Sequence, residues 1–79
     1  MNEIVQKLND VFREVFMKKD LVITAESDAS TVDGWDSLTH MMLISETEKR
    51  FNITFTFNEI MAFRNAGDIM VAILKHLSK

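Results

Sequence analysis

Seventy-nine residues without a cysteine suffice for one small domain, and its stability must come from an apolar core because no disulfide or thiolate metal site is available. Apolar residues make up 47% of the chain, proline is absent and glycine occurs only at Gly34 and Gly67, which favours uninterrupted helices. The first residues do not resemble a signal peptide and no apolar run is long enough to cross a membrane. We therefore expect a cytoplasmic protein that does not bind membranes.

The net charge of −3 is distributed unevenly along the chain. From Asp20 to Glu48 there are seven acidic residues and neither lysine nor arginine, whereas the rest of the chain has five acids and nine bases. Such a stretch argues against binding of nucleic acid and favours a basic surface on a partner protein, which charge would steer into contact. The alternative is that the acids only solvate a long loop.

The first predicted helix covers residues from about Asn2 to Met17. Its apolar residues repeat at the spacing of one helical face: Ile4, Leu8, Val11 and Val15, widened by Val5, Phe12 and Phe16. A long connection follows, from about Asp20 to Asp36, with many turn-forming residues. We expect Leu21, Ile23 and Val32 to anchor it, and the segment 21–23 either packs onto the helices or forms one short strand-like piece.

The second predicted helix runs from about Ser37 to Phe51, with Asp36 as its N-cap. The residues expected on its buried side are Leu43, Thr47 and Phe51, with His40 and Ile44 beside them. Leu38 and Met41 are expected to be exposed. Met42 either joins them at the surface or fills the core beneath the loop.

Two further helices are predicted after an extended segment in which Ile53 and Phe55 alternate toward one face. Thr56 and Glu59 have the spacing of a capping box and should begin a short helix from about Phe57 to Phe63. Asn65 should cap the last helix, with the apolar stripe Ile69, Met70, Ile73, Leu74 and Leu77 and with Lys75, His76 and Lys79 at its end. The sequence thus predicts an all-α, four-helix bundle: one domain over residues 1–79, with three main helices, a short third helix and a long loop between the first two.

The motif Gly34-Trp35-Asp36-Ser37-Leu38 lies where the polar loop meets the second helix. Ser37 falls in the first turn, where free N–H groups and the positive end of the helix dipole would stabilise a phosphodiester on its Oγ. Trp35 should brace the helix start by packing beneath it. We interpret Ser37 as an attachment point.

A catalytic role for Ser37 is the alternative that the spacing raises. Ser37 and His40 are three residues apart on one predicted helix face, and Asp33 or Asp36 could orient the imidazole. However, a chain of this size offers little room for a substrate pocket and an oxyanion hole. His40 is then a packing or surface residue, and neither it nor His76 has neighbours spaced as metal ligands. An unmodified helical interaction module, with Asp36 as an ordinary cap, stays open as a second reading.

The chain resembles acyl and peptidyl carrier proteins. The motif from Gly34 to Leu38 matches the one in which the serine receives 4′-phosphopantetheine from coenzyme A, and Phe51, Ile53, Phe55 and residues 65–69 match further along. The resemblance implies a monomeric, non-catalytic carrier whose Ser37 holds an arm ending in a thiol, which binds acyl groups as thioesters. It also implies that Asp36 lies beside the magnesium ion of the phosphopantetheinyl transferase. The docking face that it implies for this transferase and for acyl-loading and acyl-processing enzymes, of ligase, ketosynthase or condensation type, consists of Leu38, Met41, Met42, Glu46 and Glu48.

Three features differ from the common fatty-acid carriers. Lys49 and Arg50 stand where those proteins tend to have acids, and Thr39 stands where they often have an acid after the Ser-Leu pair. Trp35 before the aspartate is more usual in carriers of polyketide, nonribosomal-peptide or other dedicated pathways. The resemblance therefore favours a free-standing carrier for a specialised pathway, although a domain excised from a larger synthase would look the same.

Overall fold

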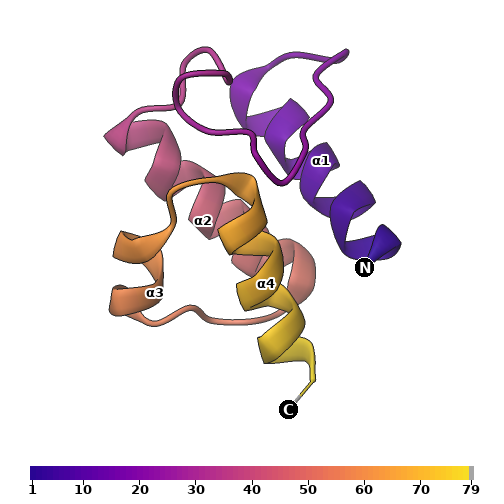
Figure 1. The fold of residues 1–79 in the computed structure, drawn as a ribbon, viewed down its shortest axis with the longest axis vertical. Coiled ribbons are helices and arrows are strands. Elements are labelled where there is room, and N and C mark those ends of the chain that lie inside the picture. Colours follow the sequence, from indigo (N-terminus) through magenta and orange to yellow (C-terminus); the bar gives the residue numbers. More distant parts are fainter. Residues whose placement is uncertain (79) are drawn as a thin grey trace.

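The computed structural model describes residues 1–78, so the predicted position of Lys79 lies outside the described residues. The helices are α1 (Asn2–Phe16), α2 (Ser37–Phe51), α3 (Phe57–Ala62) and α4 (Ala66–Leu77). The three longer helices pack together, and the short α3 lies beside α2 on the side away from α1 (Figure 1). The predicted all-α class is confirmed, and the predicted bounds of the first three helices hold to within one residue.

The core lies where the apolar faces of α1, α2 and α4 meet. The largest fully buried side chains are Leu8, Val11, Phe12, Leu43, Ile44, Thr47, Ile69 and Ile73. The predicted stripe on α4 is wrong in its last two members, since Leu74 and Leu77 are 42% and 50% exposed. The reason is that Leu74 and Leu77 face solvent, whereas His76 of the same part of α4 packs against Glu59 and Phe55.

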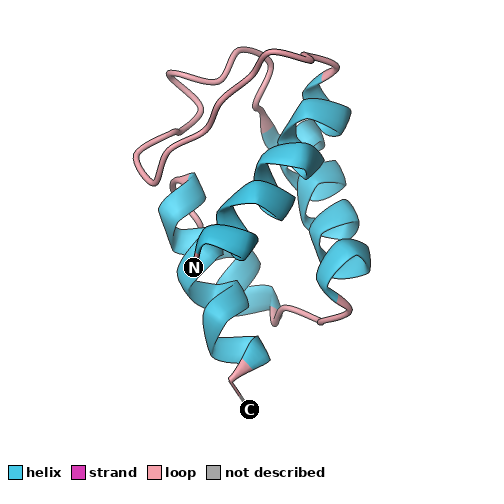
Figure 2. Cartoon of the chain, turned by 90° about the vertical axis from the view of Figure 1, so that its right-hand side faces the viewer, coloured by secondary structure: helices cyan, strands magenta, loops and turns pink. Residues whose placement is uncertain are grey.

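The long loop between α1 and α2 covers one end of the bundle (Figure 2) and is held by a side chain of α1. Asn9 Nδ2 donates to the carbonyl of Leu21 at 2.9 Å, and Asn9 Oδ1 accepts from the backbone N–H of Ile23 at 2.8 Å. Ile23 and Val32 are buried, as predicted. The segment 21–23 packs onto the bundle as coil and does not form a strand. The loop is therefore fixed by buried hydrogen bonds as well as by apolar anchors.

The same loop also touches the start of α4. The backbone N–H of Ala66 donates to Ser27 O at 2.8 Å, and that of Gly67 donates to Ala25 O at 2.9 Å. A Cβ atom at Gly67 would lie 2.8 Å from Ala25 O, closer than real contacts allow. Glycine is needed at position 67 because the loop backbone approaches it so closely.

The start of α2 is fixed by a reciprocal capping box. Asp36 Oδ1 accepts from the N–H groups of Leu38 and Thr39 at 3.0 and 2.9 Å, while Thr39 Oγ1 accepts from Asp36 N at 2.8 Å and donates to Gly34 O at 2.7 Å. These bonds, above all the one from the backbone of Thr39, hold the pKa of Asp36 below its ordinary value. The predicted cap is confirmed. Gly34 turns the chain into it with a φ of 91°.

The short α3 begins with the predicted capping box, in which Thr56 Oγ1 accepts from Glu59 N at 3.1 Å and Glu59 Oε1 accepts from Thr56 N at 2.8 Å. The Glu59 carboxylate also contacts Nε2 of His76 at 3.0 Å, which ties α3 to the end of α4.

Across residues 1–78, the structure contains no helix with the length and apolar character needed to span a lipid bilayer.

We predict that Asn9→Ala lowers the free energy of unfolding by about 1–3 kcal/mol, because the buried N–H of Ile23 loses its acceptor. Chemical denaturation monitored by circular dichroism measures this change. Gln6→Ala, on the exposed side of the same helix, is the matched control and should change stability little. Equal stability of the two variants would contradict the role given to Asn9.

We also predict a pH-dependent contribution of Asp36 to stability. Since its pKa is lowered in the folded chain, its stabilising effect is complete above the ordinary value of 3.8 and is lost as the pH falls through the lower folded value. Thermal unfolding of the native chain and Asp36→Asn between pH 6 and about pH 2 tests this. The difference in melting temperature should shrink below pH 3.8. A constant difference would argue against the ionised cap, and the comparison cancels the effects of Asp28 and Glu59, whose pKa values are also lowered.

Candidate functional site

Ser37 is the first residue of α2 and is exposed to solvent. Its position is fixed from two sides: Asp36 and Thr39 hold the first turn, and the buried Trp35 anchors the chain just before it. The Trp35 ring packs edge-on against Phe12 of α1, with centroids 5.3 Å apart. The prediction that Trp35 braces the helix start is confirmed. A hydroxyl group is thus held at a defined point on the surface.

The electrostatics around Ser37 differ in one respect from the expectation. The N–H groups of Leu38 and Thr39 are not free, because the Asp36 carboxylate already accepts from both. The prediction that free N–H groups await a phosphodiester is therefore wrong for these two groups. What remains at this helix end is the positive end of the dipole together with an ionised carboxylate beside the hydroxyl.

No group of three or more potential metal ligands exists among residues 1–78. Asp36 therefore offers a metal ion a single carboxylate, and the remaining ligands would have to come from other molecules.

A groove of about 550 Å³ begins at Ser37 and runs between α2 and α3. It is lined by Ala29, Trp35, Asp36, Ser37, His40, Met41, Ile60, Met61, Phe63 and Arg64. Most of this lining is apolar. We call this the α2–α3 groove.

His40 has a structural role in the α2–α3 groove. The indole N–H of Trp35 donates to His40 Nδ1 at 3.1 Å, so the ring proton is on Nε2, which donates to the carbonyl of Ile60 at 3.1 Å. Neither nitrogen is then available to take a proton from Ser37. The structure excludes the paired Ser37–His40 base and agrees with the interpretation of His40 as a packing residue.

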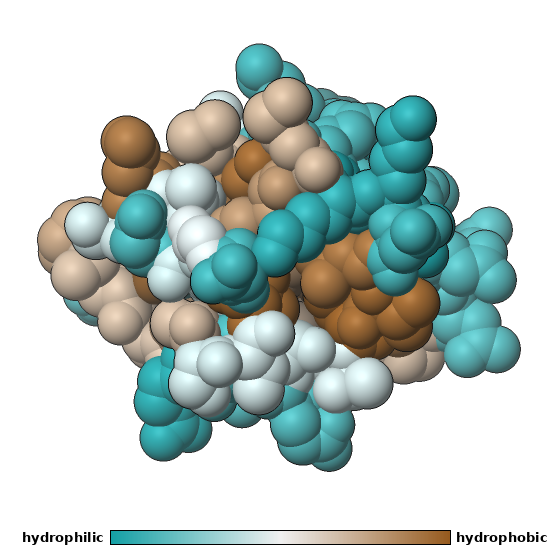
Figure 3. Space-filling model, turned by 90° about the horizontal axis from the view of Figure 1, so that it is seen from above, coloured by the Kyte–Doolittle hydropathy of each residue, from teal (hydrophilic) through white to brown (hydrophobic). Residues whose placement is uncertain are grey.

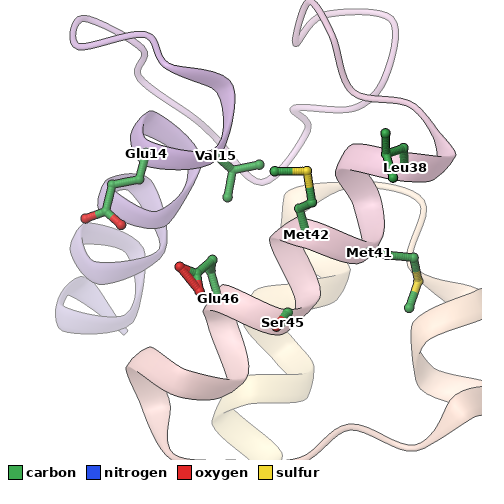
Figure 4. A pocket seen from close by; sticks show the side chains of 7 residues that line it. All are labelled: Glu14, Val15, Leu38, Met41, Met42, Ser45 and Glu46. Carbon is green, nitrogen blue, oxygen red and sulfur yellow. The ribbon is translucent and has the colours of Figure 1, made fainter.

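The exposed face of α2 also has an apolar surface on the side that faces α1, away from the α2–α3 groove. Leu38, Met41 and Met42 are 71%, 51% and 47% exposed, which confirms the first two predictions and places Met42 at the surface. With Val15 of α1 they line a second groove of about 450 Å³, rimmed by Glu14, Ser45 and Glu46 (Figure 4). Figure 3, which looks down on the end covered by the long loop, shows hydrophobic surface lying open between polar side chains.

The two glutamates of the expected docking face differ in their surroundings. Glu46 is on the rim of the second groove and pairs with Lys49 at 3.4 Å. Glu48 is half-buried, and its Oε2 accepts from the backbone N–H of Phe55 at 2.8 Å. Glu48 therefore holds the segment that leads to α3, and the structure does not bring it into the groove with the other four.

Arg50 also has partners within the chain. Its guanidinium contacts Glu14 at 3.2 Å and Asp10 at 3.9 Å, both on α1. These two ion pairs could not be predicted from sequence patterns, because their members are 40 and 36 residues apart. Of the two basic residues that set the chain apart from fatty-acid carriers, Lys49 is the more exposed.

Comparison with known proteins places this geometry in a family. Residues 6–73 match the family described as the phosphopantetheine attachment site. The fold is similar to that of a holo acyl carrier protein from Geobacter metallireducens, with a TM-score of 0.86 and 36% identity over 94% of this chain and 85% of that one. It is also similar to a Mycobacterium tuberculosis protein assigned as an acyl carrier protein, with a TM-score of 0.81 and 25% identity over 91% of this chain and 96% of that one.

Proteins of this family interact with phosphopantetheinyl transferases and with biosynthetic enzymes, and they carry intermediates without catalysing their conversion. The chain belongs to the phosphopantetheine-binding carrier proteins, and it is an acyl carrier with 4′-phosphopantetheine as its prosthetic group.

Proposed function

We propose that Ser37 is the residue that receives 4′-phosphopantetheine. The observation that carries this proposal is an exposed serine hydroxyl at the first residue of α2, directly after the ionised N-cap Asp36. An exposed hydroxyl at a rigid helix start can be reached by a transferase, and its product projects into solvent. The arm ends in a thiol, which carries acyl groups as thioesters.

The residues around Ser37 suit this group. The positive end of the α2 dipole stabilises the negative phosphodiester, and the capping box keeps the hydroxyl at a fixed place. The ionised Asp36 carboxylate beside the hydroxyl would lie next to the magnesium ion that the transferase uses. Because Leu38 N and Thr39 N are already bonded to Asp36, that carboxylate stays oriented while the transferase approaches.

We further propose that Leu38, Met41, Met42 and Glu46 form a docking face for the transferase and for acyl-loading and acyl-processing enzymes. Flexible methionines and an exposed leucine next to Ser37 provide apolar contact, and acids on the rim guide a basic partner. Glu48 belongs to the edge of this face, where it also supports the segment before α3.

The pathway that we propose is a specialised one, of polyketide, nonribosomal-peptide or another dedicated type. Trp35, Thr39 and the exposed Lys49 support this proposal over general fatty-acid synthesis. Thr39 is required within the chain by the capping box, and Lys49 gives the far end of α2 a positive group. The partners would then be ligases and ketosynthase or condensation enzymes whose surfaces tolerate that charge.

The organisation of residues 1–79 as one domain, the monomeric state and the cytoplasmic location stay predictions. Light scattering of the purified chain measures the monomeric state directly.

We predict that a broad-specificity phosphopantetheinyl transferase with coenzyme A adds one phosphopantetheine to the native chain and none to Ser37→Ala. Intact mass spectrometry measures the gain. Ser45→Ala is the matched control, because Ser45 is an exposed serine of the same helix, and it should be modified like the native chain.

An unmodified native chain, with circular dichroism showing a normal helical fold, would contradict the proposal. It would favour the unmodified helical interaction module instead.

We predict that Met41→Glu lowers kcat/KM of the transferase about tenfold or more, because it puts a charge into the apolar part of the docking face. kcat/KM is measured from initial rates, with the concentration of the carrier chain, which is the substrate, varied below KM. Val71→Glu is the control: Val71 is 49% exposed, close to the 51% of Met41, but lies on α4. Equal effects of the two substitutions would argue against a docking face on α2.

A further inference from the structure

The His40 ring lines the α2–α3 groove and joins the two helices. Its Nδ1 accepts from Trp35 Nε1 at 3.1 Å and its Nε2 donates to Ile60 O on α3 at 3.1 Å. The two rings are also nearly parallel, with their planes 15° apart and their centroids 6.1 Å from each other. Both ring nitrogens are occupied, and the imidazole is fixed across the space between α2 and α3.

Behind His40 the space is filled by further aromatic rings. Phe63 packs edge-on against His40 with centroids 6.5 Å apart, and Phe55 packs edge-on against Phe63 at 5.1 Å. Phe55 is buried and contacts His76, whose bond to Glu59 holds α3 against α4. The groove that begins at Ser37 is therefore backed by a cluster of aromatic rings, of which His40 and Phe63 line it.

An alkyl chain that entered the core from Ser37 would have to displace the His40 imidazole. Trp35 Nε1 and Ile60 O, whose bonds to His40 are partly buried, would then lose their partner, which is unfavourable. A short group meets no such obstacle, because the mouth of the groove is apolar and open, with Met41 and Met61 at 51% and 67% exposure.

We propose that His40 is a specificity-determining residue, which closes the α2–α3 groove and restricts the cargo that the helices cover to short acyl groups. Longer chains stay outside the core. The proposal rests on attachment at Ser37 and deepens that function by naming the class of cargo.

The test begins with the native chain loaded from acetyl-, octanoyl- and myristoyl-coenzyme A by a broad-specificity transferase. Intact mass first establishes that the arm is attached. Absence of a mass gain would overturn attachment itself, whereas the next measurement concerns only His40. The three loaded forms should melt within about 1 °C of one another, because no additional apolar surface is buried by the longer chains. Amide NMR signals of Phe55 and Ile69 should stay unchanged with chain length.

A melting temperature that rises by several degrees from acetyl to octanoyl in the native chain, with shifted signals at Phe55 and Ile69, would overturn the proposal. These measurements use only the native chain, so they test the proposal even if a variant at position 40 does not fold.

His40→Ala supplies the complementary arm. With the ring removed, the octanoyl form should melt about 4 °C or more above the acetyl form, since the chain can bury itself between α2 and α3. A purely structural role of His40 would lower both melting temperatures equally. Phe57→Ala, on α3 but outside the lining of the groove, is the matched control and should behave like the native chain. A folded His40→Ala without any dependence on chain length would also overturn the proposal.

Discussion

The geometry around Ser37 depends on the contacts of one buried side chain, the indole of Trp35. Its ring packs against Phe12 of α1, its N–H bonds to His40 of α2, and through His40 it reaches the backbone of α3. The residue directly after it in the chain is the cap of α2. A single side chain from the loop therefore connects α1, α2 and α3, and it does so within two residues of the attachment serine.

The helices and their starts were predictable because they depend on neighbours in the sequence. Apolar residues at helical spacing identified the core faces of α1 and α2, and Asp36, Thr56 and Asn65 marked the first turns of three helices. The exposure of Leu38 and Met41 followed from the same periodicity, because apolar residues covered more of α2 than one buried face needs.

Contacts between residues far apart in sequence were not predictable from such patterns. Nothing in the spacing of Asn9 shows that it binds the loop backbone 12 and 14 residues later. The bond of Glu48 to the backbone of Phe55 and the ion pair of Arg50 with Glu14 were equally unpredictable, since the sequence pattern is that of exposed charges. Thr39 does follow a local pattern, since a threonine three residues after the cap can close a capping box as glutamate does.

The short α3 has a consequence for the order in which the chain folds. Its six residues include none that is buried, and an isolated helix of this length is not stable in water. It is held by side chains of its neighbours, His40 from α2 at Ile60 and His76 from α4 at Glu59. α3 therefore depends on α2 and α4 for its stability, and we expect it to be less protected against local opening than the longer helices. Opening of α3 would uncover the groove beside Ser37, and the bonds of the α2 capping box do not depend on α3, because they join only residues 34–39.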